Sequence, residues 1–244
     1  MKILIFGATS AIAQSTARHF ARDGAEFILI ARNEKKLMSV AADLRVRGAT
    51  EIVALSIDAT DLNSFEEQFK SSVRVLGGLD TVLVAHGVLP DQNACEKDAQ
   101  IALNTFQINT TSTISLLTII ANYFEREKKG CITVLSSVAG DRGRKNNYVY
   151  GASKAAVSTY LQGLRARLSA TGVSVVTVKL GFVLTPMTAH LSKSLLSADA
   201  DTVGRRIYQV MKRPRSVVYI PGYWRWIMAV IRSVPESIFK RINL

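Results

Sequence analysis

A tyrosine and a lysine stand four positions apart in Tyr150-Gly-Ala-Ser-Lys154, a spacing that places both side chains on one face of a helix. A phenol with an ordinary pKa of about 10 is a poor proton donor or acceptor at neutral pH. A neighbouring ammonium favours the phenolate, so we expect Lys154 to lower the pKa of Tyr150. Such a pair suits proton transfer at the oxygen of a carbonyl or an alcohol.

Two further polar residues precede this pair. Ser137 lies 13 positions before Tyr150 and follows an apolar run of strand length, 131–135. Asn109 lies a further 28 positions upstream in a helical stretch. The Tyr-x-x-x-Lys spacing is common on solvated helix faces and has little specificity by itself. Together with Ser137 and Asn109 it indicates a catalytic site.

The N-terminal segment predicts a phosphate-binding turn. The apolar run 2–6 leads directly into Gly7-Ala-Thr-Ser-Ala-Ile-Ala13, and a helical pattern begins at Gln14. A strand, a turn of small residues and a helix N-terminus place backbone N–H groups and the positive end of the helix dipole where a pyrophosphate can bind. The later two glycines of the usual fingerprint are alanines here, so a plain strand-to-helix turn is the alternative.

The residue after the second apolar run bears on the choice of cofactor. Arg32 follows the run 26–31, at the point where the ribose of an adenosine would lie. An acidic residue there would bind a free ribose 2′-hydroxyl, whereas an arginine can pair with a 2′-phosphate. Arg32 therefore favours NADP(H), with NAD(H) possible. The alternative is a solvated arginine that opens the next helix.

Apolar runs of strand length alternate with amphipathic helical stretches along the chain. We expect strands near residues 2–6, 26–31, 51–57, 80–85, 131–136, 173–179 and 216–220. Strands that are separated by helical crossovers form a parallel sheet with helices on both faces. The sequence therefore predicts a single-domain α/β fold, a doubly wound seven-stranded parallel Rossmann sheet over residues 1–222, followed by a basic tail at 223–244.

Length and composition fit one globular domain. The chain has 244 residues, of which 48% are hydrophobic, enough to bury a large core. Its N-terminus shows no apolar segment of signal-peptide length, so we expect a cytoplasmic protein. Cys95 and Cys131 lack metal-ligand spacing and are too few for a disulfide framework. We therefore expect two reduced cysteines and no metal site.

The net charge of +12 is typical of proteins that bind nucleic acid, an anionic membrane or an acidic partner. Much of the excess lies in 205–244, where nine basic residues stand against one acidic residue. Trp and Tyr alternate with Arg there on an apolar stripe, a pattern typical of a helix lying in a membrane interface. We expect the protein not to bind nucleic acid. We expect residues 223–244 to attach it peripherally to the inner face of the cytoplasmic membrane. The alternative is an arm that packs on a neighbouring subunit. The stripe comprises Trp224, Ile227, Met228, Ile231, Ile238, Phe239 and Ile242.

Over residues 1–220 the chain resembles the short-chain dehydrogenase/reductase family, whose catalytic tetrad matches Asn109, Ser137, Tyr150 and Lys154 in order and spacing. The resemblance implies an NAD(P)H-dependent ketoreductase that forms a homodimer or homotetramer. Tyr150 would be the general acid/base, and Ser137 would orient the substrate oxygen. Lys154 would bind the nicotinamide ribose and lower the pKa of Tyr150. Asn109 would hold a water of the proton relay.

The resemblance extends to the cofactor site. Asp58 matches the adenine contact of the family, and Val183 and Thr185 match the segment that meets the nicotinamide amide and the phosphates. The Asn-Asn-Ala-Gly of the family is Val84-Ala-His-Gly87 here, and we expect His86 to lie beside the cofactor without a direct chemical role. The cofactor-binding residues that we expect are Gly7, Thr9, Ser10, Ile12, Arg32, Asp58, Ala59, Ala85, Gly87, Lys154, Val183 and Thr185.

The segments 85–92, 140–150 and 185–191 resemble one branch, the reductases that complete the epimerisation of decaprenylphosphoryl ribose by reducing a 2-keto pentofuranosyl intermediate. That branch implies a keto sugar linked to a polyprenyl phosphate as substrate. The basic residues shortly before Tyr150 can line the substrate entrance and bind a phosphate or another anion, or form a solvated loop or an oligomer contact. They are Arg142, Arg144 and Lys145.

Two other functions fit parts of the pattern. A basic rim would also suit reduction of a 3-oxoacyl group on an acidic carrier protein. A dinucleotide sensor without catalysis would keep the fold and bind a partner. The tetrad argues against the sensor, because a sensor has no need for Ser137 and Tyr150 together.

Overall fold

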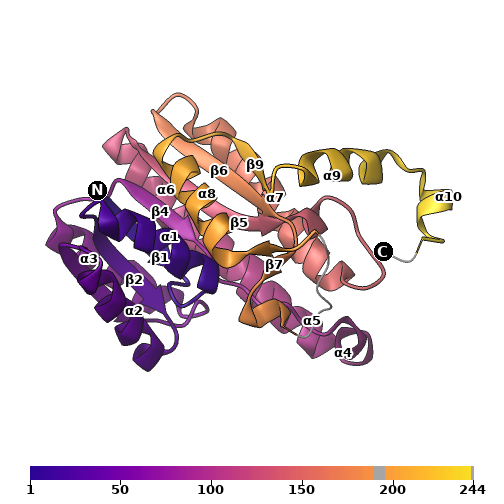
Figure 1. Cartoon of the computed structure of the whole chain (residues 1–244), viewed down its shortest axis with the longest axis horizontal. Coiled ribbons are helices and arrows are strands. Elements are labelled where there is room, and N and C mark those ends of the chain that lie inside the picture. Colours follow the sequence, from indigo (N-terminus) through magenta and orange to yellow (C-terminus); the bar gives the residue numbers. More distant parts are fainter. Residues whose placement is uncertain (190–195, 243–244) are drawn as a thin grey trace.

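Seven strands form one sheet in the order β3-β2-β1-β4-β5-β6-β9, and every neighbouring pair is parallel. The structure is a computed structural model that describes residues 1–189 and 196–242 (Figure 1). The expected α/β doubly wound sheet is confirmed, with each predicted strand found to within one residue at either end. The strands are β1 (Lys2–Phe6), β2 (Glu26–Ala31), β3 (Glu51–Ser56), β4 (Thr81–Val84), β5 (Gly130–Ser137), β6 (Val173–Leu180) and β9 (Val217–Ile220).

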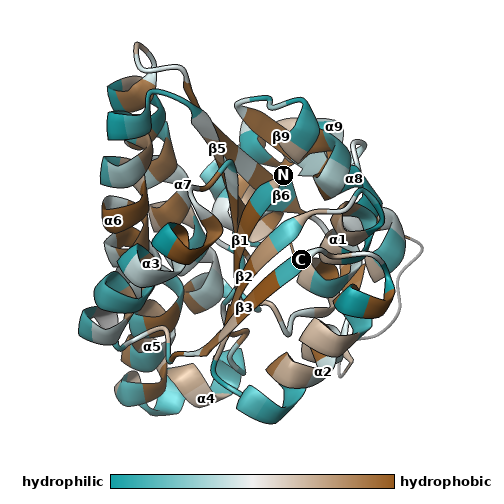
Figure 2. Cartoon of the chain, turned by 90° about the vertical axis from the view of Figure 1, so that its left-hand side faces the viewer, coloured by the Kyte–Doolittle hydropathy of each residue, from teal (hydrophilic) through white to brown (hydrophobic). Residues whose placement is uncertain are grey.

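Helices cover both faces of the sheet, as Figure 2 shows edge-on. One face packs against α1 (Ala11–Arg22), α2 (Glu34–Val46) and α8 (Ala200–Lys212). The other face packs against α3 (Leu62–Leu76), α6 (Ser112–Glu127) and α7 (Tyr148–Leu168).

The sequence of β1 explains why it belongs between two helical layers. Successive side chains of a strand point to opposite faces of the sheet. Ile3 and Ile5 accordingly pack in the core on the side of α1, whereas Leu4 and Phe6 pack in the core on the side of α6. A strand that is buried on both faces needs an uninterrupted apolar run, which is the signal that made it predictable.

The strand order reverses between β1 and β4. From β1 the chain proceeds outward to β2 and β3, and it then returns to β4 and continues to the opposite edge. Crossover connections therefore diverge at the carboxyl ends of β1 and β4. In open parallel sheets this divergence leaves a crevice in which ligands bind.

The connections contain short elements that the sequence pattern did not predict. A π-helical turn, Gln107–Thr111, joins α5 (Ala99–Phe106) to α6, and α4 (Gln92–Lys97) precedes α5. Single π turns inside helices occur frequently at functional sites. The remaining short elements are the 3-10 turns Val138–Gly140 and Pro186–Thr188 and a two-stranded sheet of β7 (Val183–Leu184) and β8 (Ala198–Asp199).

The C-terminal segment forms α9 (Trp224–Ser233) and α10 (Glu236–Phe239) at the edge of the sheet, in yellow in Figure 1. Trp224 and Met228 are buried against Val138, and a side chain on Gly181 would overlap the Trp224 indole. The predicted apolar stripe is therefore not one free face, because part of it packs on the sheet domain. No helix within the described residues is long and apolar enough to span a membrane.

Candidate active site

The four residues predicted to act together are brought to the carboxyl ends of β4 and β5. Asn109 lies in the π turn, Ser137 ends β5, and Tyr150 and Lys154 lie in the first two turns of α7. A Cβ atom on Gly87 would lie 3.1 Å from Asn109 Oδ1 and 3.4 Å from Lys154 Nζ. These two polar atoms therefore approach the same glycine after β4.

Asn109 is held rigidly by its hydrogen bonds. Its Oδ1 atom accepts from the backbone N–H of Val88 at 2.7 Å, and its Nδ2 atom donates to the Val88 carbonyl at 2.9 Å and to Ser153 Oγ at 3.1 Å. The side chain is completely buried, and the residue occupies the π turn. This arrangement ties the π turn to the loop after β4 and to α7.

The Ser137 side chain lies close enough to the Tyr150 phenol for hydrogen bonding to act on the pKa of that phenol. The Ser137 Oγ atom also accepts from the backbone N–H of Ala139 at 3.1 Å. The Ser137 hydroxyl also lies 3.4 Å from the carbonyl of Leu180 at the end of β6. A carbonyl oxygen placed between the two hydroxyls can therefore receive hydrogen bonds from both.

The protonation states differ from those expected from sequence. Burial raises the pKa of Tyr150 to about 12, although its hydrogen bond with Ser137 acts in the opposite direction. Burial also lowers the pKa of Lys154 to about 8. The pKa of Tyr150 is therefore raised and not lowered as expected, because loss of solvent disfavours the phenolate. Tyr150 is consequently a neutral phenol, the form that can donate a proton.

Lys154 is close to the tyrosine without being hydrogen-bonded to it. Its Nζ atom lies 5.8 Å from the centroid of the Tyr150 ring and donates to the Leu135 carbonyl at 3.2 Å. One hydrogen bond leaves two of the three ammonium protons available for other acceptors. Lys154 can therefore bind a hydroxyl group in the groove beside Tyr150.

A groove runs over the carboxyl ends of the strands from Arg32 to Tyr150. It consists of two hollows, one beside Arg32 and Asp58 and the other beside Tyr150 and Lys154. Both hollows are lined by the same central residues, so they form one continuous surface. The shared residues are Thr9, Ser10, Ala85, His86, Gly87 and Met187.

The turn after β1 fits a dinucleotide pyrophosphate. Gly7 has a φ angle of +83°, and a Cβ atom there would lie 2.6 Å from the backbone nitrogen of His86, so no other residue is tolerated. Ser10, at the N-cap of α1, makes no side-chain hydrogen bond to the helix, and the first turn of α1 has no acidic residue. The first N–H groups of α1 are therefore free to bind an anion.

The far end of the groove fits an adenosine. Arg32 is largely exposed, and its Nη1 atom lies 4.0 Å from Asp58 Oδ2. Hydrogen bonds from the side chain and the backbone of Thr60 lower the pKa of Asp58, so its carboxylate is charged. A guanidinium that is loosely paired at the rim can turn toward a 2′-phosphate.

His86 lines both hollows, as expected of a residue beside the cofactor. Burial lowers its pKa to about 3, so the imidazole is neutral. Its Nε2 atom lies 2.9 Å from Ser112 Oγ and 3.2 Å from Thr113 Oγ1, and its ring packs edge-on against Phe6. These contacts support a structural role for His86 in the wall of the groove.

Most of the other predicted cofactor residues also line the groove. Gly7, Ala59, Ile12 and Thr185 border one hollow or the other, whereas Val183 is buried in β7 and borders neither. The segment 185–191, used for the branch resemblance, extends beyond residue 189 and so lies partly outside the described residues. The sequence did not predict some residues that line the groove, because their residue types indicate no catalytic or binding role. They could have been found only from their positions beside a strand end or a turn. In the hollow beside Tyr150 they are Ala11, Leu135, Ser136, Leu180, Pro186 and Met187, and in the hollow beside Arg32 they include Phe6, Ala31, Ile57, Val88 and Ile108.

The three basic residues expected at the substrate entrance lie outside both hollows, in the loop between β5 and α7. Lys145 is exposed, whereas Arg144 is buried. Arg142 donates from Nη1 to the Ile231 carbonyl at 2.8 Å and is only 14% exposed. The two arginines are therefore not part of a solvated loop.

Comparison with known proteins agrees with this geometry. The family model described as short chain dehydrogenase matches residues 1–195. The chain belongs to this family. An uncharacterized oxidoreductase of Mycobacterium tuberculosis is 34% identical over 98% of this chain and 96% of its own length. An uncharacterized oxidoreductase of Streptomyces coelicolor is 32% identical over 98% of this chain and 95% of its own length.

Solved structures show the same fold for this short-chain dehydrogenase. The crystal structure of levodione reductase superposes with a TM-score of 0.83 at 20% identity, covering 91% of this chain and 96% of that one. The protein is therefore a short-chain oxidoreductase that acts on a CH–OH or C=O group and binds a nicotinamide dinucleotide. The groove, with its glycine turn and uncapped helix N-terminus, fits that cofactor.

Proposed function

We propose that this short-chain dehydrogenase is an NAD(P)H-dependent ketoreductase. The observation that carries the proposal is the neutral Tyr150 phenol, hydrogen-bonded to Ser137 at one end of the groove. Ser137 and Tyr150 bind and orient the ketone oxygen. The bound dinucleotide supplies the hydride. Tyr150 then donates its phenolic proton to the oxygen, and no covalent intermediate is needed.

Lys154 and Asn109 support this proton transfer. The Lys154 ammonium stabilises the phenolate that remains after Tyr150 has lost its proton, and it binds a ribose hydroxyl of the cofactor. We expect Asn109 to hold a water through which the proton is replaced. The direct test is the oxidation of NADPH or NADH by the full chain with a panel of ketones. Lack of turnover with every ketone, in spite of cofactor binding, would favour the sensor alternative.

We favour a keto sugar linked to a polyprenyl phosphate as the substrate class. Support comes from the three sequence segments of the branch resemblance. A lipid extract from a strain that lacks the gene should accumulate the keto intermediate. Accumulation of a 3-oxoacyl carrier protein instead would favour the second ketoreductase candidate.

We expect the enzyme to prefer NADPH to NADH through Arg32. The Arg32→Ala variant should reduce the free-energy preference for NADPH over NADH by about 1–3 kcal/mol, the scale of a hydrogen bond to a charged group. The side chain is 77% exposed, so solvent screening places the effect at the lower end of this range. The measurement is the ratio of kcat/KM for the two cofactors in the wild type and the variant.

The matched control is Arg45→Ala. It removes an exposed arginine from the C-terminal end of α2, whereas Arg32 lies just before the N-terminal end of that helix. Its cofactor ratio should equal that of the wild type. A wild-type enzyme that prefers NADH would contradict the assignment of Arg32.

We also propose that 223–244 attaches the enzyme to the inner face of the cytoplasmic membrane, with the enzyme otherwise in the cytoplasm. Trp226 and Val230 on α9 are 71% and 66% exposed, and Ile238 on α10 is 54% exposed. Arg225 lies over the Trp226 ring at 5.7 Å. Basic side chains near an anionic leaflet contribute about 1 kcal/mol each, so binding should weaken as salt rises.

Sedimentation with anionic vesicles tests this attachment. The full chain should bind, and binding should be lost in the double variant Trp226→Gln/Val230→Gln, which leaves the buried Trp224 and Met228 in place. A chain that ends at Gly222 should also fail to bind. The control Val46→Gln alters an exposed apolar residue on α2. If wild type and double variant bind equally poorly, the subunit-arm alternative is the better one.

A further inference from the structure

Two arginines of the loop between β5 and α7 have opposite surroundings. Arg142 has several partners in the C-terminal segment. Its Nη1 atom donates to the carbonyls of Ile231 at 2.8 Å and Val234 at 2.5 Å, and Nη2 forms an ion pair with Glu236 at 2.8 Å. Its guanidinium also lies 3.9 Å from the centroid of the Phe239 ring. Arg142 therefore has a structural role, holding α9 and α10 against the loop.

Arg144 is buried without such partners. Its side chain is 9% exposed, and its Nε atom is buried with no hydrogen-bond partner among the described residues. Its Nη2 atom donates only to the Met228 sulfur at 3.3 Å, and a thioether is a weak acceptor. No acidic side chain pairs with it in the described part of the chain.

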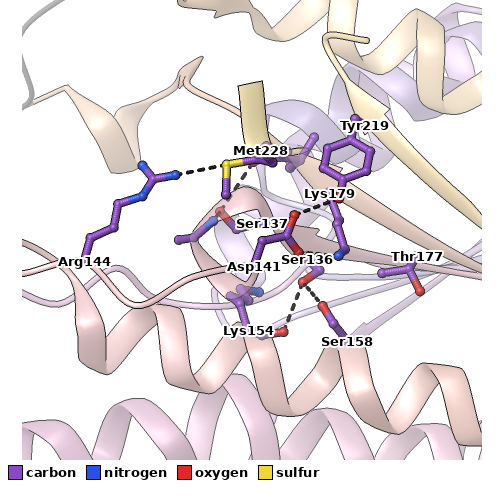
Figure 3. Close-up of polar contacts among 12 residues, drawn as sticks. Ser136, Ser137, Asp141, Arg144, Lys154, Ser158, Thr177, Lys179, Tyr219 and Met228 are labelled. Atoms are coloured by element: carbon purple, nitrogen blue, oxygen red, sulfur yellow. Dashed lines mark hydrogen bonds and ion pairs between the residues drawn. The ribbon is translucent and has the colours of Figure 1, made fainter. Parts of the chain in front are cut away.

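Asp141 carries the carboxylate nearest to Arg144 in the loop, and this carboxylate already has other partners. Asp141 forms an ion pair with Lys179 and accepts a hydrogen bond from the Tyr219 hydroxyl at 2.7 Å (Figure 3). The Asp141 side chain is 3% exposed, so the two donors hold it in the interior. Burial accordingly lowers the pKa of Arg144 in spite of the charge on Asp141.

Arg144 lies in the loop that connects Ser137 to Tyr150, and its partner Met228 packs against Val138, the residue after Ser137. Figure 3 shows the Arg144 guanidinium directed toward the Met228 sulfur, in the same view as Ser137. Trp224, in the same small cluster as Met228, likewise has a buried Nε1–H without a partner among the described residues.

A guanidinium that is buried without a counter-ion costs free energy, and a donor without an acceptor adds to that cost. The cost is offset when an oxyanion binds, because the planar fork of N–H groups matches a carboxylate or a phosphate. We propose that Arg144 binds the oxyanion group of the substrate, so that the enzyme reduces a ketone that also carries a phosphate or a carboxylate. This rests on the proposed ketoreductase function and names its substrate class.

The test measures thermal unfolding of the full chain saturated with the dinucleotide that it binds more tightly. Saturation keeps added anions out of the dinucleotide site. Sodium phosphate and sodium acetate are each compared with sodium chloride at the same ionic strength, in the wild type, in Arg144→Met and in Arg126→Met. The last variant removes the same charge from an exposed position on α6.

Wild type and Arg126→Met should both unfold at a higher temperature with phosphate or acetate than with chloride. The oxyanion that gives the larger shift identifies the group. The shift should vanish in Arg144→Met, because this variant should bind the oxyanion at least tenfold more weakly. In chloride alone, Arg144→Met should unfold at the same temperature as wild type or higher, because it lacks an unpaired buried charge.

Two results would overturn the proposal. One is the absence of a specific oxyanion effect in wild type, or an equal effect in all three proteins. The other is a marked fall in the unfolding temperature of Arg144→Met in chloride, as expected for a structural arginine. None of these measurements depends on turnover, so failure of the ketoreductase proposal would be recognised separately, by the absence of ketone-dependent cofactor oxidation.

Discussion

Tyr150→Phe will lower kcat for ketone reduction by about 10²–10⁴-fold, the usual contribution of a general acid, while the dissociation constant of the dinucleotide stays unchanged. The substitution removes only the hydroxyl that carries the transferable proton. The high pKa of Tyr150, about 12, means that wild type holds this proton throughout the neutral range. Steady-state turnover and a separate titration of cofactor fluorescence measure the two effects.

Tyr148→Phe is the matched control. Tyr148 lies two positions earlier, at the start of α7, and its side chain is 45% exposed. It should behave as wild type in both measurements. If Tyr150→Phe retains more than a few per cent of the wild-type kcat, the proton donor has been assigned to the wrong residue.

Lys154→Ala will impair both turnover and cofactor binding, because one ammonium supports the Tyr150 phenolate and binds the ribose. Loss of a hydrogen bond to a charged group costs about 1.5–3 kcal/mol, which corresponds to a tenfold or greater loss of cofactor affinity. Lys154→Met, which keeps most of the side-chain volume, controls for the cavity that alanine creates. The two variants should show the same loss of affinity. Unchanged affinity in both would remove Lys154 from the nucleotide site.

The pH profile gives an independent readout of the same residue. The pKa of Lys154 lies near 8, so the ammonium is present below this pH and is lost as pH rises through it. Wild-type kcat/KM for reduction should therefore fall above about pH 8, whereas Tyr150 keeps its proton until about pH 12. The decline near pH 8 should be absent from the residual activity of Lys154→Met. A decline at the same pH in that variant would assign the titration to another group.

The sequence determined the sheet and the spacing of the proposed catalytic residues. Strands buried on both faces must be continuous apolar runs, so their positions could be predicted without a structure. Tyr150 and Lys154 share a helix face by periodicity alone, and parallel strands place their carboxyl ends at one edge of the sheet. Local patterns therefore sufficed to predict the fold, the groove and the order of its residues, with the comparisons confirming the family.

Tertiary structure decided everything that depends on burial and on partners remote in sequence. Trp224 and Met228 belong to an apolar stripe that looks the same in sequence whether it faces a lipid or Val138. Arg142 and Arg144 are two positions apart and chemically identical, yet the first donates to backbone carbonyls and a carboxylate of the C-terminal segment, whereas the second donates there only to the sulfur of Met228. The direction of the shift in the Tyr150 pKa was likewise set by burial. Loss of solvent and the contact of distant segments arise only when the chain has folded, and no local pattern of residue types encodes them.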